Sequence, residues 1–284
     1  MIDLDAVRIV LRALTYVGSI AAAGGVLFAL SFPRAADTIR GGLERQIAIG
    51  CCLLLLIEPA RYAAFQLAIS AGDWARAFGP DLRWVGLQTP MGQAAATRLI
   101  AAVMILILNL RLSAARATAA FVIIVSFALE GHTASSEARS AAGTAGLLLH
   151  VTAVHWWLGA LYPLLVLTRS AEPAGLSAVV ERFGRWAIWI VAALLAGGVL
   201  VLAVLTGVRL NLESSYQQRF LLKIAFVAGL LSIAAWNRLR LTPLLTRNPE
   251  TGRARLRASI KAEMLVGLSV LVTTAWALNS SPEG

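Results

Sequence analysis

The sequence predicts an all-α membrane protein, a polytopic bundle of about eight transmembrane helices. Of its 284 residues, 58% are hydrophobic and only 14% are charged, and the mean hydropathy is +0.75. Mostly apolar stretches of about 18 residues or more recur along the chain, as the hydrocarbon core of a bilayer requires. These stretches lack the two-residue alternation of a membrane β-barrel, so we expect helices.

Eight apolar runs lie between charge clusters, and each is near the roughly 20 residues that a helix needs to cross the hydrocarbon core. We expect helices, in chain order, at Ala6–Phe32, Gln46–Ser70, Pro90–Leu112, Ala114–Gly131, Gly143–Thr168, Phe183–Arg209, Arg219–Trp236 and Ile260–Asn279. No linker or low-complexity segment divides the chain. Residues 1–284 are therefore expected to form a single membrane domain in contact with the lipid bilayer.

Two similar segments suggest an internal duplication. Residues 89–98 read TPMGQAAATR and residues 214–223 read SSYQQRFLLK, each with a hydroxyl residue followed nine positions later by a basic one. Four spans separate them, so the related halves, 1–140 and 141–284, would share one orientation in the membrane. This arrangement predicts a site between the halves.

The basic residues are unevenly distributed between the two sets of connections. Connections 34–45, 111–116, 169–185 and 238–261 carry fifteen lysines and arginines, and the opposite side carries seven. The positive-inside rule therefore places the first set in the cytoplasm and both termini in the periplasm of a bacterial inner membrane. The acidic start, Met-Ile-Asp-Leu-Asp, is unlike a secretory signal.

The net charge of +10 is explained by this topology and does not indicate a nucleic-acid partner. No segment resembles a nucleotide-binding or phosphorylation motif, so direct coupling to ATP is not expected. We expect a protein that is not an enzyme.

Ionisable residues within the spans are candidates for function, because each is costly to insert in a bilayer. Glu58 and Arg61 are three residues apart on one helical face, which predicts a structural ion pair. Arg98 and Lys223 lie close enough to the outer surface to extend towards it. Glu263 lies near the cytoplasmic start of the last span, where neighbouring cations and the helix dipole favour a carboxylate.

All three histidines, His132, His150 and His155, fall within 24 consecutive residues, in the outer half of the predicted membrane domain. His150 and His155 are about 140° apart around a helix of 3.6 residues per turn, so they face different neighbours. His132 and His150, on consecutive antiparallel helices, are the more plausible pair.

Neutral imidazole suits copper, zinc and haem iron. A thioether at Met91, which opens the third span on the same side, favours copper(I). Haem b held between His132 and His150 is the alternative. The adjacent Cys51 and Cys52 are either packing residues or a copper(I) ligand pair near a cytoplasmic exit.

Several segments together resemble the copper-resistance D (CopD, PcoD-like) membrane proteins along nearly the whole chain. FALEGHTA at 127–134 resembles the family's Gly-His-Ala element, and LLLHVTAVHWWLGALYPLL at 147–165 resembles its His-x6-Trp-Leu-Gly-Gly-Leu element. The family's Thr-x-x-Gly…Arg-Leu element is resembled by TPMGQAAATRL. Its Tyr-Gly-x-x-Leu-x-x-Lys…Asn-Arg…Pro element is resembled by SSYQQRFLLKIAFVAGLLSIAAWNRLRLTPLL, and Glu263 also fits the family pattern. Gln217 and Ala160 replace expected glycines.

The resemblance implies a copper-handling inner-membrane protein that moves copper from periplasm to cytoplasm, often beside a separate periplasmic CopC-like carrier. An assembly factor that delivers copper without net transport is a further alternative. The family motifs carry over the metal candidates His132 and His150 and the supporting or gating residues Arg98, Trp157, Tyr216, Lys223, Asn237 and Glu263. Met91 is a third candidate metal ligand from its position alone. His155 does not match the family pattern.

Overall fold

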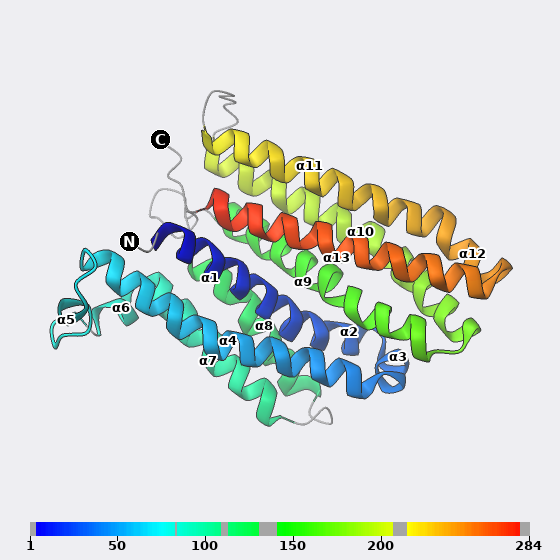
Figure 1. Cartoon of the computed structure of the whole chain (residues 1–284), viewed down its shortest axis with the longest axis horizontal. Coiled ribbons are helices and arrows are strands. Elements are labelled where there is room, and N and C mark those ends of the chain that lie inside the picture. The colour runs from blue at the N-terminus through cyan, green and yellow to red at the C-terminus, as the bar shows by residue number, and fades with distance from the viewer. Residues whose placement is uncertain (1–3, 83, 109–112, 131–140, 207–214, 279–284) are drawn as a thin grey trace.

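The computed structural model describes residues 4–82, 84–108, 113–130, 141–206 and 215–278, and every element in them is helical. Seven helical segments are long and apolar enough to cross a membrane, and a shorter apolar helix, Ala114–Leu129, occupies the place of the fourth predicted span. The chain is thus a polytopic helical bundle (Figure 1).

The first four passes form one part of the bundle. Its elements are α1 (Leu4–Ser19), the π-helical turn η1 (Ile20–Gly24), α2 (Gly25–Ser31), α3 (Pro33–Thr38), α4 (Arg40–Ile69), the short α5 (Trp74–Ala77) and α6 (Val85–Gln88), α7 (Pro90–Ile107), α8 (Ser113–Val125) and the 3₁₀ turn η2 (Ser126–Leu129). The second part contains α9 (Ala141–Ser170), α10 (Pro173–Thr206), α11 (Ser215–Trp236), the π-helical turn η4 (Asn237–Leu241), α12 (Thr242–Arg247) and α13 (Pro249–Ala277).

The first residue of α1 and the last of α13 lie at one end of the bundle, which we call the terminal end (Figure 1). Helices α3 and α12 lie at the other end, which we call the α12 end, together with the short connection between α9 and α10. An even number of crossings brings both termini to one side, as the sequence predicts. The predicted halves remain an expectation.

Several helices begin earlier than their apolar runs, because polar turns continue the backbone hydrogen bonding beyond the hydrocarbon region. Helix α4 begins at Arg40, α10 at Pro173 and α13 at Pro249. The start of α13 is fixed locally, since Asn248 accepts a hydrogen bond from the Thr251 amide at 3.2 Å and Pro249 occupies the first turn. The fourth pass, α8 with η2, agrees with the predicted run to within two residues and ends just before Glu130.

The two parts meet where η1 crosses α9. A side chain at Gly24 would place its Cβ 2.6 Å from the Cα of Gly159, so the two backbones are in contact and only glycine fits. The Gln46 side chain of α4 donates to the Gly159 carbonyl at 3.1 Å. Aromatic packing extends this contact, with Trp156 of α9 stacked on Phe183 of α10 at 5.0 Å between ring centroids. Helix α9 is thereby fixed against both parts of the bundle.

Candidate functional site

An ionic cluster, formed by Thr15, Glu58, Arg61, Arg98 and Glu130, lies inside the terminal half of the bundle. It joins α1, α4, α7 and the end of η2. Arg61 Nη1 donates to both Glu58 oxygens at 3.2 Å, and Arg61 Nη2 donates to Glu130 Oε2 at 3.0 Å. The predicted Glu58–Arg61 ion pair is thus confirmed, within a larger network.

Arg98 completes the ionic cluster. Its Nη1 pairs with Glu130 Oε1 and lies 3.4 Å from Glu58 Oε1, while its Nε donates to Ser126 Oγ at 2.9 Å. The Arg98 side chain is 0% exposed and lies inside the bundle, which excludes the alternative that it extends to the membrane surface. The carboxylates of Glu58 and Glu130 hold it in the interior, where two positive and two negative charges balance.

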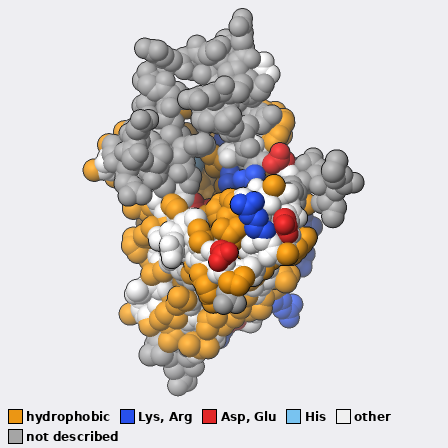
Figure 2. All heavy atoms as spheres, turned by 90° about the vertical axis from the view of Figure 1, so that its left-hand side faces the viewer, with side chains coloured by type: hydrophobic (Ala, Val, Ile, Leu, Met, Phe, Trp, Pro, Cys, Tyr) orange, Lys and Arg blue, Asp and Glu red, His pale blue; other side chains and the backbone are white. Residues whose placement is uncertain are grey.

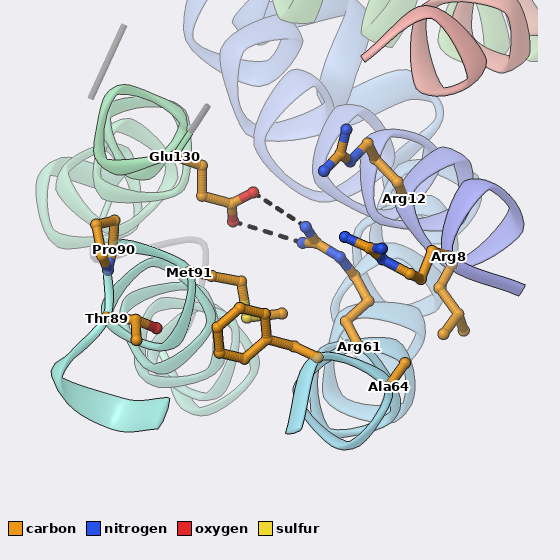
Figure 3. Close-up of a pocket in the computed structure, with 10 residues that line it drawn as sticks. Arg8, Arg12, Arg61, Ala64, Thr89, Pro90, Met91 and Glu130 are labelled. Atoms are coloured by element: carbon orange, nitrogen blue, oxygen red, sulfur yellow. Dashed lines mark hydrogen bonds and ion pairs between the residues drawn. The ribbon is translucent and has the colours of Figure 1, made fainter. Parts of the chain in front are cut away.

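A cavity of about 420 Å³ opens beside this cluster at the terminal end. Figure 3 shows Arg61 and Glu130 paired across it, with Arg8 and Arg12 of α1 at its side and Met91 of α7 among the lining residues. Figure 2 looks onto this end and shows basic and acidic side chains gathered among hydrophobic ones. The predicted ligand Met91 therefore lines a cavity of mixed polarity, and its thioether is a ligand type that suits a soft metal ion.

His155 lies against the ionic cluster through an aromatic ring. The Arg98 guanidinium lies 4.3 Å from the ring centroid of Phe127, and that ring lies 5.7 Å from the His155 imidazole. His155 Nδ1 lies 2.8 Å from the Val151 carbonyl, to which it must donate. In the neutral ring Nε2 then carries a lone pair, and it is buried without a partner among the described residues. Sequence reasoning had assigned His155 no role.

His150 faces a different helix, as the helical geometry predicts. Its Nδ1 lies 2.8 Å from the Leu194 carbonyl of α10, and its ring rests against Gly198, where an added Cβ would lie 3.3 Å from Nδ1. Lys223 of α11 is near enough to act on it electrostatically. His132 falls outside the described residues, so its pairing with His150 stays a prediction. Met91 lines the terminal-end cavity, which does not include His150.

A second cavity, of about 340 Å³, lies in the other half of the molecule between α9, α10, α11 and α13, and we call it the α12-end cavity. It brings together three residues that the resemblance had implied separately, Trp157, Asn237 and Glu263. Asn237 belongs to η4, a π-helical turn of a kind often found at functional sites. Its Nδ2 donates to Glu263 Oε1.

The remaining predicted residues are less informative. Tyr216 is the second residue of α11, and its side chain lies outside the described part of the chain.

Cys51 is buried and Cys52 exposed, so the adjacent sulfurs point to different sides of α4. Among the described residues, no group of three histidine, cysteine or acidic side chains is placed to hold a metal ion.

Comparisons with known proteins identify the type of chain. The family description "Copper resistance protein D-like, N-terminal domain" matches residues 1–144, and "Copper resistance protein D" matches residues 177–277. The chain is 27% identical to Copper resistance protein D of Pseudomonas syringae pv. tomato over 98% of each protein. No solved structure matches.

Two further relatives align with a smaller share of the chain. Inner membrane protein YebZ of Escherichia coli (strain K12) is 25% identical over 76% of this chain and 78% of that protein. Copper transport protein CutJ of Bacillus subtilis (strain 168) is 28% identical over 57% of this chain, which spans only 30% of CutJ. None of these descriptions mentions haem, so the haem alternative gains no support from them.

Proposed function

Because this chain belongs to the copper resistance protein D family, we propose that it transports copper across the bacterial inner membrane, from the periplasm to the cytoplasm. Family membership makes it a copper-related membrane protein. Transport, its direction and the orientation of the termini are the proposal. The arginine-rich connections at the α12 end favour that end as the cytoplasmic one.

The observation that carries the proposal is the pair of cavities at opposite ends of one bundle. The terminal-end cavity contains the Met91 thioether, a ligand type that suits copper(I). The α12-end cavity contains Trp157, Asn237 and Glu263. A transporter needs access from both sides, whereas an assembly factor that keeps copper on the periplasmic side has no use for the second cavity.

Helix α9 connects the two cavities in this proposal. It presents His155 Nε2, which has no hydrogen-bond partner in the described part of the chain, near the ionic cluster, and Trp157 in the α12-end cavity. His150, with His132, would supply the imidazole ligands of the outer-half site, and Met91 would capture copper(I) on entry. A separate periplasmic carrier of the CopC type would present the ion at the terminal end.

Copper(I) uptake into proteoliposomes tests the proposal. The wild-type protein should accumulate copper above protein-free vesicles, and His150→Ala and His132→Ala should abolish that accumulation. Met91→Leu, which keeps the volume and removes the sulfur, should reduce uptake at limiting copper concentrations. Unchanged uptake in both histidine variants would contradict the proposed site, and the absence of uptake in the wild type would favour the assembly-factor alternative.

A further inference from the structure

Glu263 differs from the other buried carboxylates in lacking a cationic partner. Its side chain is 3% exposed. Glu58 and Glu130 pair with Arg61 and Arg98. Among the described residues, no lysine, arginine or histidine lies within ion-pairing distance of Glu263. A carboxylate in this position would be a buried, uncompensated charge.

The residues around Glu263 offer little charge compensation. The segments of α9, α10, α11 and α12 that line the α12-end cavity contribute no titratable side chain, and η4 contributes Arg238. Arg238 Nη1 donates to the Gly184 carbonyl of α10, so one of its donors is already engaged. On α13 itself, Arg253 and Arg257 bond to the end of α9, at the Ala171 and Thr168 carbonyls. Lys261 is exposed.

Asn237, the hydrogen-bond partner of Glu263, has a side-chain oxygen that lacks a donor in the described part of the chain. Asn237 Nδ2 donates to Glu263 Oε1, but Asn237 Oδ1 is buried and has no hydrogen-bond donor among the described residues. A buried amide oxygen without a donor is destabilising, because it has lost its hydrogen bonds to water. The Asn237 side chain therefore has its nitrogen bonded to Glu263 and an oxygen that still needs a donor.

We propose that Glu263 and Asn237 form a proton-binding site, in which Glu263 is a neutral carboxylic acid that donates to the Asn237 side-chain oxygen. The two groups then make a cyclic pair, with one hydrogen bond in each direction. The site needs no cation, which accounts for a carboxyl group in an apolar cavity.

The proton on Glu263 affects how copper enters the cavity, and this step rests on the proposed transport function. When a copper(I) ion enters the α12-end cavity, its positive charge favours the ionised form of Glu263. The O–H bond of Glu263 breaks, the proton passes to water, and the copper charge balances the carboxylate. One proton is therefore released for each copper ion that reaches the cavity, with no change in the total charge there.

Infrared difference spectroscopy in detergent tests the proton site without any transport. The wild-type protein should show the carbonyl stretch of a protonated carboxylic acid at neutral pH, with a shift in heavy water. That band should be lost in Glu263→Gln, which has the same shape, and kept in the matched control Glu250→Gln, an exposed acid on the same helix. A wild-type spectrum without the band would overturn the proposal even if the variants failed to fold.

Copper-induced proton release then tests the coupling separately. Adding copper(I) to purified wild-type protein in weak buffer should release about one proton more than in Glu263→Gln. Equal release from the two proteins, with the infrared band present, would overturn the coupling and leave the proton site standing. Loss of copper binding in both proteins would count against the proposed function instead.

Discussion

In the terminal half Glu58 and Glu130 share two arginines, whereas in the α12-end cavity Glu263 has a single amide partner. Both regions bury carboxyl groups, and both draw on helices far apart in the sequence. In the terminal half each carboxylate has arginine partners, so the opposite charges compensate one another. In the α12-end cavity, the charge of an ionised Glu263 can be removed by a proton or balanced by a cation that enters the cavity. The comparison separates a structural polar site from one that is able to change its charge state.

The largest effect should follow from removing one charge of the ionic cluster. Arg98→Met keeps most of the side-chain volume but leaves Glu58 and Glu130 with one arginine between them. We expect a loss of about 3–5 kcal/mol in the free energy of unfolding, measured by denaturation in detergent. The double variant Arg98→Met with Glu130→Gln should recover much of that loss, because it restores the charge balance. An unchanged stability of the single variant would show that the cluster is not a fixed ionic network.

A smaller loss should follow at the α12-end cavity when the amide partner is removed. Asn237→Leu leaves Glu263 without a hydrogen-bond partner, but a neutral acid loses far less than an ion does. We expect a destabilisation of about 1–3 kcal/mol in the same denaturation experiment. A loss as large as that of Arg98→Met would mean that Glu263 is ionised, and would remove the distinction between the two regions.

The smallest change is expected for Glu263→Gln. A neutral amide of the same shape replaces a neutral acid, so the free energy of unfolding should change by less than about 1 kcal/mol. Glu58→Gln is the matched comparison, because the same substitution there removes a charge that two arginines require. We expect Glu58→Gln to lower the free energy of unfolding more than Glu263→Gln does. Equal losses in the two variants would argue against the difference between the regions.

Most of the fold could be predicted from the sequence, because bilayer thickness sets the length of each apolar run. The helical ends were the exception. Helices α4, α10 and α13 begin in polar turns that hydropathy does not recognise. Local geometry was also predictable, as with the Glu58–Arg61 pair at three residues' separation and the divergence of His150 from His155.

The contacts between distant helices could not be predicted in this way. Arg98 and Glu130 are 32 residues apart, and Asn237 and Glu263 are 26 apart. The family resemblance marked Asn237 and Glu263 individually, but their contact depends on how η4 and α13 pack. The partnerless Nε2 of His155 likewise became visible only once its Nδ1 bond to Val151 was known.

Copper(I) uptake into proteoliposomes, recorded together with the pH of the vesicle suspension, tests the central claim most directly. With wild-type protein we expect copper accumulation accompanied by proton movement, with both lost in His150→Ala and the proton signal lost in Glu263→Gln. Wild-type vesicles that accumulate no more copper than protein-free vesicles would contradict the account.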